Sequence, residues 1–423
     1  MTTGSKTQGT MAQRRRRDAL AHPLSTQSSS RQAASDRVRV AIVTESFLPA
    51  LNGVTTSVCK VLESLSAAGH EALVIAPGTS PWSATATPER FAGFPIHPVT
   101  SLPVRQFRVG LPSYELETVL HRFGPDVVHV SSPFILGVRG LTAARALGLP
   151  SVAIYQTDMP SYIRQHSGPA GNLTARATWR WIRRIHAQAD ITLAPSTSAL
   201  RDLQEHGIER TALWGRGVDS DLFHPDRASD EQTQELRARL APHGEILLGY
   251  VGRLAPEKEL HRLIELGTMP GVRLVLVGEG PSEEMLADAL PTAHFLGRRE
   301  GIDLARCYAA CDAFVHTGTR ETFGQTLQEA AASGLPVIAP ARGGPLDLVE
   351  QGRTGILFDP EVPGALAAAA CELIGSDPVA GAALRGQMGQ AGRERVVARS
   401  WPELTRQLVE HYRAAISARS LSR

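Results

Sequence analysis

Short apolar runs alternate with amphipathic segments along most of this chain, in the order expected for the strands and helices of a parallel sheet. The first such unit has a strand over 38–43, a loop over 44–53 and a second strand over 71–76. The helix predicted between the loop and the second strand carries apolar residues three or four positions apart, namely Val54, Val58, Leu62 and Leu65. A strand–loop–helix–strand unit of this kind opens a parallel α/β sheet.

The pattern continues and then begins again in the second half of the chain. Further strands of the first half are predicted at 126–130, 151–155 and 190–194. Strands of the second half are predicted at 246–251, 273–277, 313–316 and 336–339, with a helix at 259–267. The polar stretch 227–234 between the halves is predicted to be a linker. The expected fold is therefore α/β, with two doubly wound Rossmann-like domains in series.

These patterns divide the chain into four predicted segments. Residues 1–36 are expected to form a disordered basic tail, because the Ser, Thr, Gln and Arg there cannot bury enough apolar surface to fold. The two domains are predicted over 37–230 and 231–400. Residues 401–423 contain a helical pattern that begins at Trp401. This C-terminal helix either closes the second domain or packs back on the first.

The charge of the chain is unevenly divided. Residues 1–37 hold seven Lys or Arg and two Asp, whereas the remainder carries 37 basic and 40 acidic residues. A mildly acidic body argues against a nucleic-acid binder. No apolar run approaches the roughly 20 residues of a transmembrane helix, so a cytoplasmic protein is expected. Contact of the basic tail with anionic lipid, at about 1 kcal/mol per basic residue near the surface, is an alternative to a leader without a role.

The four cysteines, Cys59, Cys307, Cys311 and Cys371, are few and scattered. Cys307 and Cys311 are spaced for one helix face, but no Cys or His set around them indicates zinc. Small buried side chains in a reducing compartment are expected. No Gly-x4-Gly-Lys-Ser/Thr phosphate loop is present, which argues against an ATPase.

Two cations follow one predicted strand, and two acids flank a later loop. Arg253 and Lys258 come after the strand at 246–251, and Glu321 and Glu329 lie eight residues apart. Ligands of doubly wound sheets bind beyond the carboxyl ends of the strands. Arg offers a planar fork to phosphate oxygens and Lys a mobile positive charge. The combination indicates a ligand that carries phosphates and hydroxyls, such as a nucleotide sugar, although a solvated ion pair would explain the two cations alone.

The two glutamates are expected to occupy different places. A helix is predicted to begin within the run 323–326, where its first N–H groups favour a phosphate. Glu321 precedes that helix and can reach a donor sugar, whereas Glu329 lies more than one turn inside it and can accept from both ribose hydroxyls. A capping acid and an exposed helical glutamate are the alternatives. Gly53 either lets a ligand approach the backbone closely or is an ordinary turn glycine.

Five motifs together resemble the retaining glycosyltransferases of family four. They are Asn52-Gly53-Val54, Gly217-Val218-Asp219, Gly252-Arg253 with Lys258, Glu321 with Glu329, and Gly343-Gly344-Pro345. The resemblance extends from about Val38 to the C-terminal helix. Within the family the chain is most similar to bacterial GDP-mannose-dependent α-mannosyltransferases, through the runs 44–55, 155–158, 214–219 and 321–326.

The resemblance implies a GT-B fold, in which two Rossmann-like domains face an inter-domain cleft. The domain 37–230 would mainly bind the acceptor and the domain 231–400 the nucleotide sugar. Arg253 and Lys258 would hold the diphosphate, with Glu321 at the transferred sugar as the third catalytic position. The implied donor site also includes Gly53, Phe323, Gly324, Gln325, Thr326 and Glu329, the last of these at the ribose. The implied acceptor side includes Asn52, Gln156 and Asp158.

The implied reaction transfers a hexose, mannose from GDP-mannose, to a lipid or glycolipid hydroxyl at the inner face of the plasma membrane. Configuration would be retained, and the departing phosphate oxygen would take the proton of the acceptor. Because Arg253 and Lys258 neutralise the diphosphate, neither a metal nor another cofactor is expected. A covalent glycosyl-enzyme would instead need a carboxylate beneath the anomeric carbon. A nucleotide-sugar 2-epimerase and a non-catalytic nucleotide-sugar-binding module are the alternatives from other functional classes.

One position departs from the family pattern. Many members carry His where this chain has Gln156, and an amide cannot act as a base. If Gln156 occupies that position, it can only orient the sugar or the acceptor through hydrogen bonds.

The stretch 164–189 is rich in Arg and contains no Asp or Glu. Trp and Ile residues interleave with the arginines, so a helix there could rest on anionic lipid headgroups. Packing of Trp181, Ile182 and Ile185 in the core of the domain is the favoured alternative.

Overall fold

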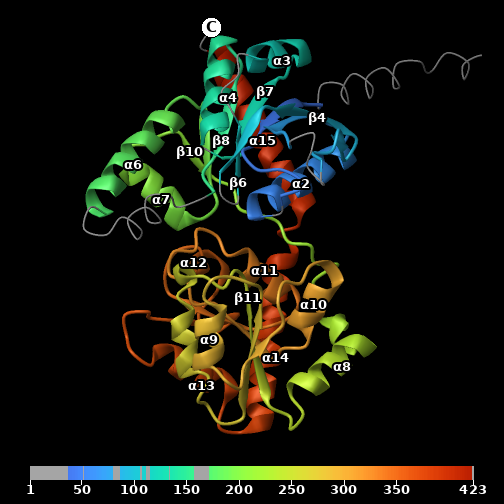
Figure 1. The fold of residues 1–423 in the computed structure, drawn as a ribbon, viewed down its shortest axis with the longest axis vertical. Coiled ribbons are helices and arrows are strands. Elements are labelled where there is room, and N and C mark those ends of the chain that lie inside the picture. Colours follow the sequence, from blue (N-terminus) through green and yellow to red (C-terminus); the bar gives the residue numbers. More distant parts are fainter. Residues whose placement is uncertain are drawn as a thin grey trace, which may run out of the picture.

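The computed structural model describes residues 37–50, 52–79, 86–104, 107–110, 115–132, 134–156 and 171–421. Two α/β domains are stacked along the long axis of the molecule (Figure 1). The predicted fold class is confirmed, because each domain is built on a largely parallel sheet. The predicted tail over 1–36 and the predicted acceptor-side residue Asp158 lie outside the described residues.

The first domain contains an eight-stranded sheet. Its strand order is β10 (Thr211–Leu213), β9 (Ile191–Ala194), β8 (Ser151–Ile154), β7 (Val127–Val130), β1 (Arg39–Val43), β2 (Glu71–Pro77), β4 (Phe94–Val99) and β3 (Arg90–Phe91). Neighbouring strands are parallel except for the short β3, which is antiparallel to β4. A separate antiparallel pair is formed by β5 (Ser101–Val104) and β6 (Phe107–Gly110). The helices are α2 (Gly53–Ala67), α3 (Glu115–Phe123), α4 (Ile135–Ala146), α6 (Gly171–His186) and α7 (Thr197–Glu205).

The second domain contains a six-stranded parallel sheet. Its order is β13 (His294–Phe295), β12 (Val272–Val277), β11 (Ile246–Val251), β14 (Ala313–Val315), β15 (Val337–Pro340) and β16 (Gly355–Phe358). The helices are α8 (Glu231–Leu240), α9 (Glu283–Ala289), α10 (Gly301–Ala309), α11 (Gln325–Ala332), α12 (Pro345–Leu348), α13 (Ala365–Ile374) and α14 (Pro378–Val397). Three short 3-10 helices are η2 (Pro225–Ser229), η3 (Pro256–Lys258) and η4 (Leu260–Glu265).

Both sheets are buried on both faces, which explains why their strands read as continuous apolar runs. Along β1, Val40 and Ile42 belong to one hydrophobic cluster, whereas Ala41 and Val43 belong to the cluster on the other side. This alternation follows from the two-residue period of a strand.

The long C-terminal helix α15 (Trp401–Leu421) packs on the first domain although it follows the second (Figure 1). Leu408 and Tyr412 are fully buried in the cluster that includes Val40, and burying such a side chain contributes roughly 1.5–3 kcal/mol. The Tyr412 hydroxyl also lies 2.5 Å from Nδ1 of His129 in β7. The chain crosses between the domains where the N–H of Val218 donates to the carbonyl of Arg399 at 3.0 Å. The two domains are therefore joined by two adjacent crossings.

Two local predictions differ from the structure. The stretch 227–234, predicted to be a linker, contains the end of η2 and the start of α8. Thr233 is its one buried residue, which explains why the stretch resembled a linker in the sequence. The helix predicted at 259–267 is the short 3-10 helix η4, which begins after Glu259 in the left-handed conformation (φ 51°).

Candidate active site

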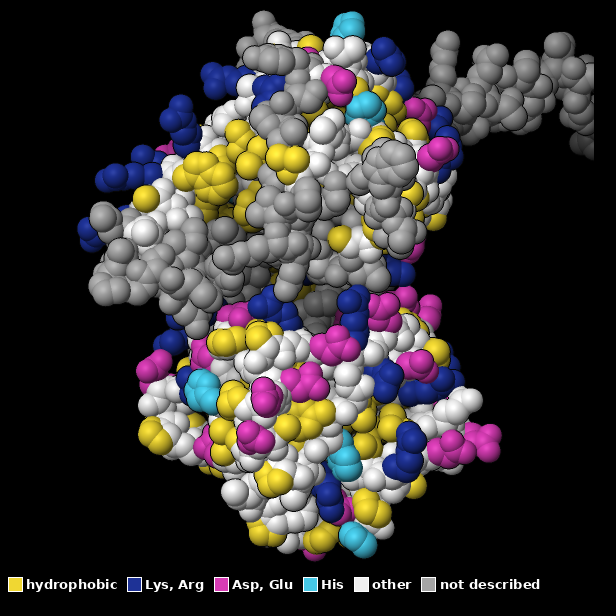
Figure 2. All heavy atoms as spheres, in the orientation of Figure 1, with side chains coloured by type: hydrophobic (Ala, Val, Ile, Leu, Met, Phe, Trp, Pro, Cys, Tyr) yellow, Lys and Arg dark blue, Asp and Glu magenta, His cyan; other side chains and the backbone are white. Residues whose placement is uncertain are grey.

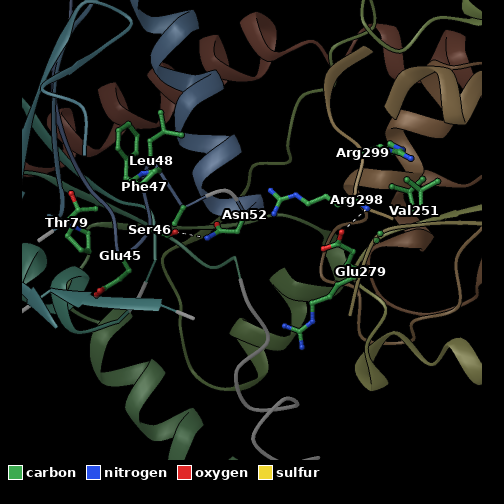
Figure 3. A pocket seen from close by; sticks show the side chains of 17 residues that line it. Glu45, Ser46, Phe47, Leu48, Asn52, Thr79, Val251, Glu279, Arg298 and Arg299 are labelled. Atoms are coloured by element: carbon green, nitrogen blue, oxygen red, sulfur yellow. Dashed lines mark hydrogen bonds between the residues drawn. The ribbon is translucent and has the colours of Figure 1, made fainter. Parts of the chain in front are cut away.

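A cavity of about 610 Å³ lies between the two domains. Its first wall comes from the loop after β1 and the end of β2, and its second wall comes from the ends of β11 and β12 and the loop after β13 (Figure 3). The first wall is formed by Glu45, Ser46, Phe47, Leu48, Pro49, Ala50, Asn52, Pro77 and Thr79. The second wall is formed by Val251, Gly252, Arg253, Val277, Gly278, Glu279, Arg298 and Arg299. Both walls thus come from carboxyl ends of strands, where doubly wound sheets bind ligands.

Asn52 fixes the first wall to helix α2. Its side-chain oxygen accepts from the N–H groups of Val54 and Thr55 at 3.0 and 3.1 Å, as an N-cap does. Its amide nitrogen donates to Ser46 Oγ at 2.6 Å, an interaction drawn in Figure 3. Asn52 lines the cavity, while its polar atoms hold the loop in place.

Lys258 and Glu321 form an ion pair in the second domain. Nζ of Lys258 lies 2.8 Å from Oε2 of Glu321, and the Lys258 carbonyl accepts from Thr317 Oγ1 at 2.7 Å. Burial by itself would raise the pKa of Glu321, but the neighbouring Lys258 ammonium and His316 ring outweigh it and hold the pKa at about 2. The Glu321 carboxylate in turn raises the pKa of Lys258. Both groups are therefore ionised at neutral pH. Neither residue lines the 610 Å³ cavity.

The loop that carries Glu321 meets the first domain at Gln156. The Thr322 hydroxyl lies 3.4 Å from the Gln156 carbonyl. Beneath the loop, the N–H of Gly344 donates to the Glu321 carbonyl at 2.7 Å, and a Cβ on Gly344 would lie 2.3 Å from the Phe323 carbonyl. The Gly343-Gly344 motif thus allows two backbones to approach, and this approach holds Glu321 in place.

The predicted residues at the start of α11 differ in their environments. The Phe323 side chain is buried in the hydrophobic core of the domain, with the Arg399 guanidinium 5.7 Å above its ring. Gly324 is left-handed (φ 103°) and precedes the first residue of the helix, and the Gln325 amide donates to the Gly217 carbonyl at 3.1 Å. The Thr326 carbonyl accepts from the Tyr308 hydroxyl at 3.4 Å. Because the Phe323 and Gln325 side chains are already engaged, the backbone N–H groups of this turn are the groups available to bind a ligand.

Glu329 and Arg253 have partners other than Lys258 and Glu321. Glu329 Oε2 accepts from the Tyr308 hydroxyl at 2.9 Å, and burial raises the pKa of this carboxyl to about 7. Arg253 is 51% exposed, lines the cavity and pairs with Glu257 at 3.3 Å. Of the two cations predicted for the diphosphate, Arg253 lines the cavity and Lys258 does not, and the exposed Arg253 side chain has room to move.

Arg216 lies beside Gly53 in the first domain, where its carbonyl accepts from the Gln328 amide of the second domain at 2.9 Å, and the sequence prediction did not single it out. Its Nη2 donates to the side-chain oxygen of Gln156 at 2.7 Å, and a Cβ on Gly53 would lie 3.1 Å from its Nη1. The amide nitrogen of Gln156 donates to the Ser131 carbonyl at 2.8 Å. Glu321 attracts the Arg216 charge, although burial, the larger effect, lowers the pKa of the guanidinium. The signals in the sequence were its place in the run 214–219, which carries part of the family resemblance, and the flanking Gly215 and Gly217.

Residues 51–222 match the family model described as Glycosyltransferase Family 4, and residues 231–395 match the model described as Glycosyl transferases group 1. A protein of Mycobacterium tuberculosis named GDP-mannose-dependent alpha-mannosyltransferase is 46% identical over 392 residues, which cover 90% of this chain and 98% of that protein. The chain belongs to glycosyltransferase family 4.

A second relative and a solved structure are also similar to this family 4 chain. An alpha-monoglucosyldiacylglycerol synthase of Acholeplasma laidlawii is 29% identical over 343 residues, which cover 76% of this chain and 85% of that protein. The solved sucrose-phosphate synthase of Thermosynechococcus elongatus shares the fold with a TM-score of 0.71 at 22% identity, over 90% of this chain and all of that chain. The protein is therefore a glycosyltransferase with the GT-B fold.

Two more ionisable residues of this family 4 glycosyltransferase lie at the site without having been predicted there. Glu45 lines the cavity and accepts from the N–H groups of Leu136 and Gly137 at the start of α4; burial raises its pKa to about 7. His316 follows β14, is 2% exposed, and has Nε2 at 3.9 Å from Oε2 of Glu321. Within the described ranges, no cluster of three or more His, Cys, Asp or Glu has metal-binding geometry, and no helix is long and apolar enough to cross a membrane.

Proposed function

We propose that this family 4 enzyme transfers mannose from GDP-mannose to a hydroxyl of a lipid or glycolipid, with retention of configuration at the anomeric carbon. The 46% identity to a GDP-mannose-dependent mannosyltransferase over nearly the whole chain supports the donor. The 29% identical relative is named alpha-monoglucosyldiacylglycerol synthase, and this name supports a lipid acceptor. The observation that carries the proposed chemistry is the Lys258–Glu321 pair at 2.8 Å, a cation and a carboxylate side by side after strands β11 and β14 of the second domain.

In this proposal the second domain holds the donor. Lys258 and Arg253 bind the diphosphate, together with the first N–H groups of α11, which have no partner inside a helix. Glu321 accepts from hydroxyls of the hexose, and Glu329 accepts from the ribose. Because the cations neutralise the leaving group, the reaction needs no divalent metal.

The proposed step breaks the bond between the anomeric carbon and the phosphate oxygen, and the electron pair stays with the diphosphate. The acceptor oxygen forms the new bond on the same face, and its proton goes to the departing phosphate oxygen. Glu321, ionised with its pKa at about 2, stabilises the positive charge that develops on the sugar. In this proposal the side-chain oxygen of Gln156, which accepts from Arg216 Nη2, also positions the Arg216 guanidinium.

Helix α6 supplies the proposed contact with anionic membrane. Ile182 and Ile185 are buried, as the core-packing alternative predicted, but Trp181 is 39% exposed and that part of the prediction was wrong. Trp181 shares the outer side of the helix with exposed arginines: Arg176, Arg180, Arg183 and Arg184. Figure 2 shows basic side chains over this edge of the first domain. An aromatic ring among arginines suits the headgroup region of an anionic bilayer, at the inner face of the plasma membrane.

The test begins with the purified protein and a set of nucleotides and nucleotide sugars. GDP and GDP-mannose are expected to raise the melting temperature more than UDP, ADP or their sugars, since a ligand at 100 times its Kd stabilises by about 2.7 kcal/mol. GDP-mannose is then incubated with diacylglycerol and glycosyl-diacylglycerol acceptors in neutral or anionic vesicles, with EDTA present. Mass analysis should show a hexose added to lipid, faster on anionic vesicles, and NMR should show the α-anomer.

Each alternative function predicts a different result. Strict dependence on Mg²⁺ or Mn²⁺ would contradict the proposed diphosphate binding. Conversion of UDP-GlcNAc without an acceptor would identify an epimerase. Tight nucleotide-sugar binding without turnover, unchanged in the matched variant Glu321→Gln, would identify a binding module.

A further inference from the structure

His316 is a buried side chain of the second domain that the proposed reaction does not yet use. It follows β14 directly, so it lies at the carboxyl edge of the sheet where the donor would bind. The ring is 2% exposed, and neither of its nitrogens has a hydrogen-bond partner among the described residues. Buried polar atoms without partners are rare, and a functional site is one of the few places that retains them.

Two other buried histidines show how unusual this environment is. Nδ1 of His129 is paired with the Tyr412 hydroxyl, and Nδ1 of His186 with Thr192 Oγ1 at 3.1 Å. Each of those rings leaves one nitrogen unpaired, whereas His316 leaves both unpaired. The packing of the fold is therefore enough to explain the first two rings but not the third.

The Glu321 carboxylate lies just beyond hydrogen-bond distance of His316 and is held by another donor. Oε2 of Glu321 lies 3.9 Å from Nε2 of His316 and 2.8 Å from Nζ of Lys258. Gly318 borders the same nitrogen, since a Cβ there would lie 3.4 Å from it. Burial lowers the pKa of His316 to about 4, so the ring is neutral at pH 7. The Lys258 charge also lowers this pKa, whereas the Glu321 and Glu259 carboxylates and the Gly318 backbone raise it. A neutral imidazole with a proton on Nε2 can donate to Glu321.

We propose that His316 is a positioning residue, which takes over the Glu321 carboxylate when Lys258 turns to the donor diphosphate. This inference rests on the proposed roles of Lys258 and Glu321. Lys258 carries three N–H donors, and in this proposal the diphosphate draws them away from their 2.8 Å contact with Glu321. As Lys258 turns away, Oε2 loses its donor, and a shift of roughly 1 Å brings it to hydrogen-bond distance from Nε2 of His316. Glu321 then stays ionised and oriented toward the sugar.

Two variants separate the hydrogen bond from the shape of the ring. His316→Leu removes the donor, whereas His316→Gln keeps an N–H donor at a similar reach. His294→Leu is the matched control: His294 lies in β13 of the same domain and is bonded to the Leu240 carbonyl at 3.0 Å, and it does not line the cavity. Turnover of GDP-mannose, the Kd of GDP and the melting temperature are measured for each variant.

His316→Leu is expected to lower kcat about 10- to 100-fold, as loss of a hydrogen bond to a charged group does, with the Kd of GDP changed less than about threefold. The acid limb of its kcat profile, which reports the donor-bound enzyme, is expected to move to higher pH, because Glu321 is easier to protonate without the donor. His316→Gln should restore most of the turnover and the position of the acid limb. A purely structural role would lower the melting temperature and leave the acid limb in place.

The inference is overturned if folded His316→Leu keeps wild-type kcat and acid limb, or if folded His316→Gln is as impaired as His316→Leu. Glu321→Gln separates this inference from the proposed function. Full turnover in Glu321→Gln would overturn both. Loss of turnover in Glu321→Gln with wild-type behaviour in His316→Leu would overturn only the role of His316.

Discussion

The two walls of the inter-domain cavity differ sharply in charge. Among the described residues of the first wall, Glu45 is the single ionisable side chain, and the remainder are mainly apolar or proline: Phe47, Leu48, Pro49, Ala50 and Pro77. The second wall contributes Arg253, Arg298 and Arg299 against Glu279. One wall is therefore suited to apolar and hydroxyl-bearing surface, and the other to phosphate.

The walls also differ in how their polar groups are satisfied. In the first wall, Asn52 and Glu45 use their oxygens to cap α2 and to bind the start of α4, so these side chains mainly fix the loop. In the second domain, the Lys258–Glu321 pair consists of groups that would exchange partners when a phosphate arrives. The first wall is therefore shaped in advance, whereas the second domain holds, outside the cavity lining, an ion pair that the proposed donor would redirect.

The largest effect should come from removing the Lys258 ammonium group. Lys258→Ala is expected to lower turnover of GDP-mannose about 10²- to 10³-fold, because a preorganised group at the developing charge is lost. Initial-rate kinetics measure this loss. Lys60→Ala is the control: Lys60 pairs with Glu63 and Asp219 on the other domain, and its removal should change turnover less than about twofold. An equal loss of turnover in Lys258→Ala and Lys60→Ala would contradict a specific catalytic role of Lys258.

A smaller effect should come from disturbing the junction between the walls. A methyl group on Gly53 would lie 3.1 Å from Nη1 of Arg216, so Gly53→Ala should shift the guanidinium and loosen its 2.7 Å bond to Gln156. We expect kcat to fall about tenfold with GDP affinity unchanged, since small misplacements in a site are costly. Kinetics and calorimetry of GDP binding check both parts.

Gly386→Ala is the control for that variant, because nothing lies within 4 Å of the added carbon in helix α14. Loss of GDP affinity in Gly53→Ala would contradict a junction effect and place Gly53 directly against the nucleotide. Wild-type kinetics would show that Arg216 tolerates the shift.

The sequence predicted the sheets well because their chemistry is repetitive. The strand at 246–251 has the bounds predicted for it, since a strand buried on both faces is apolar throughout. The hydrophobic stripe of α2 was equally regular. Seven of the described strands were not predicted: β3, β4, β5, β6, β10, β13 and β16. Six of them have only two to four residues, which carry too little pattern to stand out, and the six-residue β4 contains two prolines.

The candidate site was only partly visible in the sequence, for a different reason. Lys258 and Glu321 could be named from their motifs, but their 2.8 Å contact joins residues 63 positions apart and depends on the fold. Arg216 and Gln156 come from separate strand ends and meet only at the domain junction. His316 looks like the last residue of a strand, and only its burial without a hydrogen-bond partner sets it apart.

The smallest predicted effect compares two carboxyls with similar acidity on opposite sides of the site. Burial raises the pKa of both Glu329 and Glu45 to about 7, but only Glu329 is proposed to bind the ribose. If the ionised form of Glu329 binds, GDP affinity should fall about threefold as the pH drops from 7.5 to 6.5. Calorimetry should show that Glu329→Gln abolishes this dependence and that Glu45→Gln preserves it.

The same raised pKa has the opposite sign for stability without ligand. Between the ordinary value of 4.5 and about 7, the folded state holds a proton on Glu329 that the unfolded state has released, so stability should decrease as the pH rises through this window. Glu329→Gln should flatten that decrease in denaturant titrations, and Glu45→Gln should flatten it as well. The two carboxyls would thus contribute alike to stability while only the one beside Tyr308 controls nucleotide affinity. Dependence of GDP affinity on Glu45 instead would place the nucleotide against the first wall.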